Sequence, residues 1–188
     1  MDFTKTKFPG LIIINPDVFE DERGYFIRRY SKIDFQSMGI EKDFVEDNHS
    51  MSKKCVLRGL HFQKKPFALG KLVFVTSGSI LDISVDLRKD SPTYKQWFSM
   101  ELSAENKKML FIPEGFAHGF LSLSENTLIQ YKYTNCYNKE FEYGLIWNDP
   151  YLNIDWQLEK YGINKPIISK KDLSNLSLKE IDEMDFSF

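Results

Sequence analysis

Residues 80–87 read Ile80-Leu81-Asp82-Ile83-Ser84-Val85-Asp86-Leu87, and from Leu81 onward apolar and polar side chains alternate without a break. Successive side chains of a β-strand point to opposite faces, so strict alternation is typical of a strand with one apolar and one polar face. A turn at residues 77–79 separates this run from the apolar residues 72–75, which predict a neighbouring strand. The stretch therefore predicts a β-sheet.

Similar short runs, each bounded by turn residues, continue on both sides of residues 80–87. They are residues 11–14, 25–27, 56–63, 97–102, 109–112, 116–123 and 127–133. Many strands at short spacing, with little helix between them, are typical of an antiparallel sandwich or barrel of jelly-roll, cupin-like type. We expect an all-β fold with a few short helices, mainly near the C-terminus.

Two helices are predicted from their end signals. Ser31 can cap a helix through about Met38, which Gly39 would end. Residues 174–184 predict a terminal helix. A chain of 188 residues without a linker or internal repeat is expected to form one domain, residues 1–188.

Composition narrows the function classes. The net charge is only −2, which gives no reason to expect a nucleic acid or an anionic membrane as partner. No apolar run approaches the ~20 residues of a membrane span. No apolar segment of a signal peptide opens the chain, and Cys55 and Cys136 are the only cysteines. We therefore expect a reduced, cytoplasmic protein.

The strand predicted over residues 56–63 carries Arg58, His61 and Gln63 among apolar residues. Buried polar groups need partners, so this strand indicates either a pocket or a satisfied polar core. Strict alternation places Arg58 on the face opposite His61, and only a bulge or twist would bring the two together. An imidazole in apolar surroundings keeps its neutral form and can act as a base, although a structural histidine is the commoner case.

A metal site is not expected. The His61-Phe62-Gln63 sequence lacks the second histidine of the His-x-His pair found in metal-binding cupins, and no glutamate follows closely. Lys71 and Arg58, with Arg23, could instead bind a diphosphate, or they could form isolated ion pairs. Tyr131, Tyr133, Tyr137 and Cys136 bring phenols and a thiol into what is predicted to be one strand.

The order and spacing of several motifs resemble the dTDP-4-dehydrorhamnose 3,5-epimerases over nearly the whole chain. The motifs are Arg23-Gly24-Tyr25-Phe26, Asp47-Asn48-His49-Ser50, Leu57–Gln63, Gly70–Val73, Val85–Arg88, Ser91–Tyr94, Ile112–Phe120, Tyr131-Lys132 and Trp147–Pro150.

This resemblance implies a jelly-roll homodimer, without metal or organic cofactor, that epimerises the carbons flanking the C4 ketone of a nucleotide-linked 6-deoxy sugar. Such enzymes serve surface polysaccharide biosynthesis. The base matches His61, oriented by Asp172, and the acid on the opposite face matches Tyr131. Lys71 matches the group that stabilises the enolate oxygen. Further substrate-binding and nucleotide-binding positions match Arg58, His118, Glu142, Lys171, Asn48 and Arg23, the last reaching across the dimer.

Three positions depart from the family pattern: Arg28 replaces a glutamate, Glu46 a glutamine and Cys136 a tyrosine. Because a carboxylate accepts two hydrogen bonds from the N1–H and amino group of guanine, Glu46 suggests GDP as the carrier. A GDP-4-keto-6-deoxy-heptose is then the leading alternative substrate. Cys136 either reprotonates one carbon or fills space. Alternatives of another class are a metal-dependent cupin and a non-catalytic sugar-nucleotide binding protein.

Overall fold

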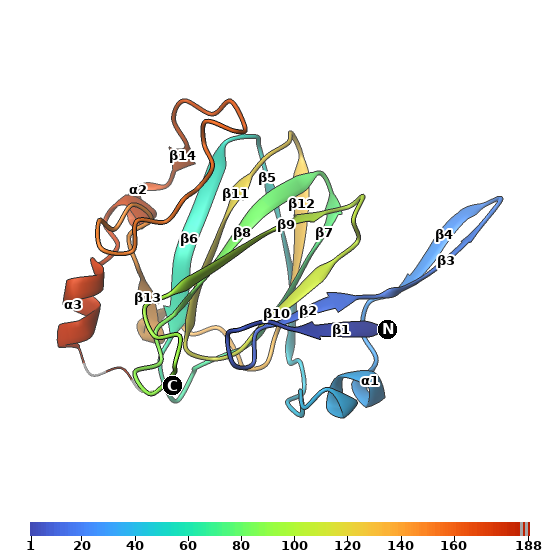
Figure 1. Cartoon of the computed structure of the whole chain (residues 1–188), viewed down its shortest axis with the longest axis horizontal. Coiled ribbons are helices and arrows are strands. Elements are labelled where there is room, and N and C mark those ends of the chain that lie inside the picture. The colour runs from blue at the N-terminus through green and yellow to red at the C-terminus, as the bar shows by residue number, and fades with distance from the viewer. Residues whose placement is uncertain (185, 187) are drawn as a thin grey trace.

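Two β-sheets face each other and make up most of the chain (Figure 1). The structure is a computed structural model that describes residues 1–184, 186 and 188. The first sheet has the strand order β1-β2-β10-β7-β12-β5. The second has the order β13-β6-β11-β8-β9, with β14 paired to β6. Neighbouring strands come from distant parts of the sequence, as in a jelly roll, which confirms the predicted all-β fold.

Every predicted run corresponds to a strand, whereas β1, β3, β5, β13 and β14 were not predicted. The first sheet contains β1 (Asp2–Lys5), β2 (Ile12–Asn15), β10 (Met109–Ile112), β7 (Lys71–Ser77), β12 (Thr127–Tyr133) and β5 (Glu46–Ser52). The second contains β13 (Glu142–Gly144), β6 (Val56–Gln63), β11 (Phe116–Ser122), β8 (Ser79–Asp86), β9 (Trp97–Ser103) and β14 (Ile167–Ile168). A separate hairpin of β3 (Asp17–Asp21) and β4 (Gly24–Arg28) projects away from both sheets (Figure 1).

The helices are short, as expected. Helix α1 (Lys32–Ser37) begins after Ser31, whose side chain accepts a hydrogen bond from the Asp34 amide. Helix α3 (Leu178–Glu183) is shorter than the predicted 174–184 because a capping box of Ser177 and Glu180 starts it later. The others are η1 (Lys139–Phe141) and α2 (Lys170–Leu173). In the described residues, no helix is long and apolar enough to cross a membrane.

Strand β8 shows how the core is layered. Leu81, Ile83 and Val85 face outward from the second sheet, where they pack against the C-terminal segment. Ile80 faces the first sheet and packs with its apolar residues, so Asp82 and Ser84, on the same face of β8, point between the sheets. Both of these polar side chains are fully buried. The polar face of the predicted strand therefore lines the interior of the molecule.

The C-terminal segment, from residue 145 onward, covers the outer face of the second sheet. Leu145, Leu152 and Trp156 belong to the same buried cluster as the outward residues of β8. Asp149 anchors this segment, since one of its carboxylate oxygens accepts the Leu178 amide hydrogen at an N···O distance of 2.8 Å. The segment buries a sheet face that would otherwise be exposed apolar surface.

Strand β6 contains a bulge, the kind of irregularity that would bring Arg58 and His61 to the same face. His118 of β11 lies opposite His61, and Phe120 lies opposite Arg58, so two steps on β11 correspond to three on β6. Such a bulge turns one side chain to the other face, and it places Arg58 on the same face as His61. Gly59 lies inside the bulge at φ +114°, where a β-carbon would stand 2.6 Å from the Gly119 α-carbon.

We expect Gly59→Ala to lower the free energy of unfolding by about 3 kcal/mol, because its methyl group would overlap the backbone of β11. Gly24→Ala is the matched control. Gly24 also has a positive φ of +121°, but its β-carbon would meet nothing within 4 Å, so we expect a loss of about 1 kcal/mol. Urea denaturation of both variants measures the difference, and equal losses would contradict the steric explanation.

Candidate active site

A histidine–carboxylate pair lies at the centre of the candidate site. The His61 Nε2 atom is 2.8 Å from Asp172 Oδ1, and Asp172 Oδ2 accepts the Gly59 amide hydrogen at 3.3 Å. The Asp172 side chain is only 6% exposed, whereas that of His61 is 26% exposed. The carboxylate is thus held inside the protein while the imidazole reaches its surface.

The charge state of Asp172 determines the role of His61. Burial alone would raise the pKa of Asp172, but its hydrogen bonds to His61, Gly59 and Ser169 outweigh burial and hold the pKa below its usual value. An ionised carboxylate only accepts hydrogen bonds. Nε2 therefore carries the hydrogen of the neutral imidazole, and Nδ1 keeps a free lone pair, as a general base requires.

We expect Asp172→Asn to lower the rate of proton abstraction by about 10²-fold, the lower end of what a positioned general base contributes, because His61 loses the partner that fixes its tautomer. The asparagine amide preserves the size of the side chain, yet it neither selects the tautomer nor stabilises the imidazolium. Exchange of substrate C–H hydrogens with deuterated solvent, followed by NMR, measures the rate. An unchanged exchange rate would show that His61 is not used as the base.

A cavity of about 70 Å³ opens beside His61. Its walls come from four strands and from the loops that follow them. They are formed by His61, Phe62, Gln63, Leu69, Lys71, Tyr133, Tyr137 and Glu142. The cavity thus brings together an imidazole, a cation, a carboxylate and two phenols beside the apolar side chains of Phe62 and Leu69. Such a cluster of titratable groups shifts pKa values and can support proton transfer.

Lys71, at the start of β7, places its ammonium group in this cavity. Its Nζ donates to the backbone oxygen of His61 at 3.2 Å. Burial lowers the pKa of Lys71 to about 8, and the nearby carboxylates of Glu142 and Asp82 oppose this decrease. The ammonium group is therefore still mainly protonated at pH 7 and lies next to His61, where a cation can stabilise a developing oxyanion.

Glu142 and Lys171 were both predicted as binding residues, and Tyr137, to which the sequence analysis assigned no separate role, joins them. Glu142 forms an ion pair with Lys171 and accepts a hydrogen bond from the Tyr137 hydroxyl at 3.0 Å. Burial opposes ionisation of Glu142, but Lys171, His61 and Tyr137 together hold its pKa below the usual value. Tyr137 and Glu142 line the cavity, and Lys171 is paired with Glu142.

Tyr131, the predicted acid, lies on the opposite sheet in the apolar cluster between the sheets. Its hydroxyl is 3.0 Å from Ser50 Oγ, and burial raises its pKa well above that of a free phenol. The phenol therefore keeps its proton at neutral pH. Tyr131 is absent from the lining of the His61 cavity as far as the described residues define it.

His118 and Arg58 extend the site on either side of His61. His118 Nε2 is 2.7 Å from Asp82 Oδ2, and burial lowers the pKa of His118 against the opposing effect of Asp82. Arg58 Nε donates to Ser52 Oγ at 3.1 Å, which places its exposed guanidinium beside β5. Strand β5 also carries the predicted nucleotide contacts Glu46 and Asn48.

Three predicted residues lie outside this group. Arg23 is at the tip of the projecting hairpin and pairs with Asp21, whereas Arg28 at its base pairs with Asp17. Cys136 is exposed. The prediction of one strand for the phenols and the thiol was wrong, because β12 ends at Tyr133 and Cys136 and Tyr137 lie in the following loop.

Gln63 was read from the sequence only as a missing metal ligand. In the structure its amide connects two loops at the cavity: Nε2 donates to the backbone oxygens of Phe67 at 2.6 Å and Cys136 at 3.2 Å. Its Oε1 accepts the Asn138 amide hydrogen at 2.7 Å. Among the residues described, no three His, Cys, Asp or Glu side chains cluster as metal ligands.

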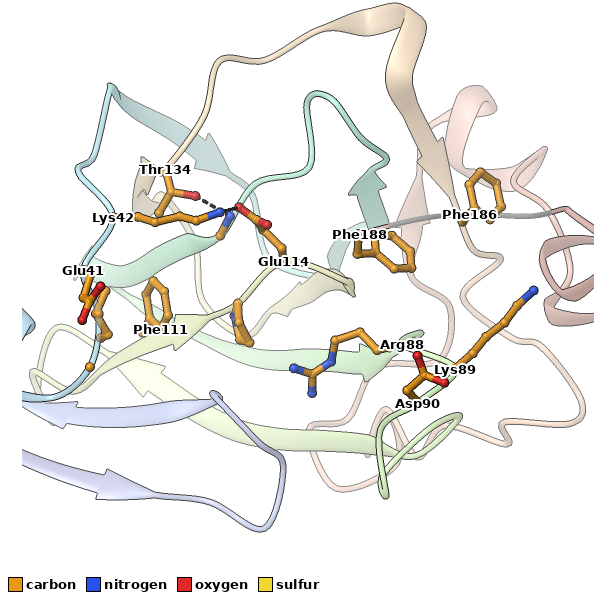
Figure 2. Close-up of a pocket in the computed structure, with 14 residues that line it drawn as sticks. Glu41, Lys42, Arg88, Lys89, Asp90, Phe111, Glu114, Thr134, Phe186 and Phe188 are labelled. Carbon is orange, nitrogen blue, oxygen red and sulfur yellow. Dashed lines mark hydrogen bonds and ion pairs between the residues drawn. The ribbon is translucent and has the colours of Figure 1, made fainter.

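A larger cavity, of about 690 Å³, lies elsewhere (Figure 2). It is lined by residues 39–42, 88–90, 113–114 and single residues that include Phe111, Thr134, Phe186 and Phe188. Two of its cations form ion pairs, Lys42 with Glu114 and Arg88 with Asp86. Within the described chain it shares no lining residue with the His61 cavity, so its size does not identify it as the site of chemistry.

The sequence model of the dTDP-4-dehydrorhamnose 3,5-epimerases matches residues 5–180. The chain belongs to this family. The epimerase of this name from Methanothermobacter thermautotrophicus is 51% identical over 179 residues, which cover 95% of each chain. These proteins are nucleotide-sugar epimerases, and the present chain is likewise a nucleotide-sugar epimerase, as the sequence analysis predicted.

Solved structures of the epimerase family have the same fold. The crystal structure of dTDP-4-dehydrorhamnose 3,5-epimerase from Elizabethkingia anophelis is 45% identical with a TM-score of 0.89, covering 96% of this chain and 97% of that one. The Legionella pneumophila epimerase, in complex with dTDP-4-keto-L-rhamnose, is 41% identical with a TM-score of 0.91, covering 97% and 95%. Both structural similarities extend over nearly the whole chain.

Proposed function

We propose that this chain inverts C3, C5 or both in a dTDP-linked 4-keto-6-deoxy sugar, for the synthesis of surface polysaccharide. The observation that carries the proposal is the His61–Asp172 pair, with the buried ammonium of Lys71 beside it. A related enzyme of known structure binds dTDP-4-keto-L-rhamnose, and this supports the same nucleotide and sugar class here.

The proposed reaction begins with proton abstraction next to the ketone. His61 Nδ1 takes the proton, the C–H electrons form a carbon–carbon double bond, and the carbonyl electrons move to the C4 oxygen. The Lys71 ammonium stabilises the resulting enolate. Tyr131 then donates its proton to the opposite face of the carbon and the ketone re-forms. Solvent returns a proton to the phenolate and takes one from the imidazolium, so the net reaction is an isomerisation.

NMR in deuterated buffer tests this function directly. With dTDP-4-keto-6-deoxyglucose, we expect solvent deuterium at C3 and C5 of the sugar and a change in the stereochemistry of the product. Exchange at C3 alone would assign a monoepimerase. A folded protein that binds dTDP but labels neither carbon would instead be a non-catalytic sugar-nucleotide binding protein.

A homodimer is part of the proposal. The β3–β4 hairpin projects away from its own sheets (Figure 1), and it carries Phe19 and Phe26 with 60% and 67% of their surface exposed. Aromatic residues exposed to this extent are typical of an interface or a ligand contact. We propose that the hairpin, with Arg23 at its tip, reaches the nucleotide site of a second copy.

GDP is a second candidate carrier, favoured by the carboxylate of Glu46 and the cation of Arg28. Calorimetry with GDP and dTDP separates the two nucleotides, and tighter binding of dTDP would exclude GDP.

The same deuterium experiment on Cys136→Ala tests the thiol. Labelling of both carbons as in the wild type would show that Cys136 takes no part.

A further inference from the structure

We propose that Glu46 and Gln63 are positioning residues that together hold the loop after β12 so that the Tyr137 phenol stays in the His61 cavity. The functional consequence rests on the proposed epimerase reaction, whereas the positioning itself is independent of it. Neither residue needs to touch the sugar for this role. The inference gives Glu46 a task other than reading the nucleotide base.

The loop needs such support because it lies outside the sheets. Strand β12 ends at Tyr133 and η1 begins at Lys139, so the backbone groups of Cys136 and Tyr137 lie outside the strands and helices. Buried or half-buried backbone N–H and C=O groups outside regular structure need hydrogen bonds from side chains, other backbone groups or water. Three consecutive residues of this loop, Cys136 to Asn138, obtain them from side chains of β5 and β6.

Gln63 holds the loop on both sides of Tyr137. Its Nε2 donates to the carbonyl oxygen of Cys136, and its Oε1 accepts the amide hydrogen of Asn138. The same Nε2 also donates to the carbonyl of Phe67 in the loop across the cavity. The side chain is 6% exposed, so all the hydrogen-bonding groups of its amide are used inside the protein.

Glu46 supplies the contact to the backbone of Tyr137 itself. Its Oε1 accepts the Tyr137 amide hydrogen at an N···O distance of 2.7 Å, and its Oε2 accepts from Asn48 Nδ2 at 3.1 Å. A carboxylate accepts at both oxygens, whereas a glutamine at this position would offer one acceptor for the two donors. Both oxygens are therefore engaged within the chain, and this accounts for a glutamate here without a guanine.

The phenol at the end of this arrangement is fixed as well. The Tyr137 hydroxyl donates to Glu142, which is itself paired with Lys171. Glu142 lies opposite Gln63 in the β13–β6 register, so one of the two positioning residues also neighbours the acceptor of the phenol. The backbone and the hydroxyl of Tyr137 are thus held by the same part of the second sheet, with Glu46 completing the contact from the first.

Amide hydrogen exchange, measured residue by residue by NMR, tests the positioning without substrate. We expect Glu46→Ala to speed exchange of the Tyr137 amide about tenfold, and Gln63→Met to do the same for Asn138. Glu46→Gln should keep exchange near the wild-type rate, because one acceptor oxygen suffices for the Tyr137 amide. Glu140→Ala, an exposed glutamate in η1, is the control. Unchanged exchange in both Glu46→Ala and Gln63→Met would overturn the proposal.

Kinetics then tests the consequence for Tyr137. We expect Glu46→Ala to lower kcat about tenfold while the Kd for dTDP changes less than twofold, and Glu46→Gln to restore kcat. In a Tyr137→Phe background, the effect of Glu46→Ala on kcat should disappear, because the group being positioned is gone. Additive effects, or a shift from GDP to dTDP preference in Glu46→Gln, would overturn the inference. An inactive wild type with faster exchange in the variants would reject only the proposed function.

Discussion

Epimerisation by the His61→Asn variant is expected to be slower than that of the wild type by about 10⁴-fold, the upper range for loss of a general base. Asparagine is close to histidine in size, and its amide can still donate to the Asp172 carboxylate, so the local structure should persist. It has no nitrogen that accepts a proton near neutral pH. The change therefore removes proton abstraction and leaves the surrounding hydrogen bonds largely intact.

Deuterium incorporation into the substrate measures this effect, because exchange requires the base even when epimerisation is incomplete. Calorimetry with dTDP is the control, and it should give a Kd within about threefold of the wild-type value. Exchange at C3 or C5 that continues at the wild-type rate would assign the base to another group. His118 would be the first to test, since it lies directly opposite His61 in the sheet.

The second large effect is expected at Lys71. Lys71→Met removes the cation beside the ketone oxygen and should lower kcat by about 10³-fold, as loss of an oxyanion-stabilising group does. The methionine keeps most of the apolar stem, so packing against the cavity walls is retained. Isotope exchange and epimerisation should fall together, because both pass through the enolate.

The pH dependence of wild-type activity should report the deprotonation of Lys71. The pKa of Lys71 is lowered to about 8 by burial, against the raising influence of Glu142 and Asp82. Below this pH the ammonium is present, and above it the charge is lost. Activity should therefore decrease as the pH rises through about 8. Lys71→Arg should abolish this decrease, because a guanidinium remains charged throughout this range. A decrease at the same pH in Lys71→Arg would assign it to another group.

The fold was predictable because its signals are local. The alternation over residues 80–87 gave the strand β8, and Ser31 with Gly39 gave the ends of α1. The orientation of the polar face was not predictable in this way. Asp82 and Ser84 face the interior because the segment beyond residue 145 covers the other face of the sheet, and that segment has no strong periodicity of its own.

The candidate site could be predicted only in part from the residue types and their spacing. His61 and Asp172 are 111 positions apart, and no spacing rule joins them, so their pairing was expected only from the family resemblance. The bulge that brings Arg58 to the face of His61 depends on how Gly59 meets β11. Strict alternation in the sequence cannot show such an irregularity.

The place of Tyr137 at the cavity and the hydrogen bonds of Gln63 to the loop were missed for a different reason. Both residues act through hydrogen bonds that involve the backbone of the loop. Because almost every residue type has the same backbone groups, such bonds leave no signal in the sequence. The sequence drew attention to Cys136 next to Tyr137, because a thiol is chemically conspicuous. In the described residues, Tyr137 lines the cavity although 49% of its surface is exposed, whereas Cys136 is exposed and does not line it.

The C-terminal segment that covers the second sheet also carries Asp172. This carboxylate is held against β6 through α2 and the Asp149–Leu178 contact. If this segment detaches, the jelly roll can persist while His61 loses its partner. The ability of the protein to act as a catalyst is therefore tied to the docking of its C-terminal covering segment, and it can be lost well before the sheets unfold.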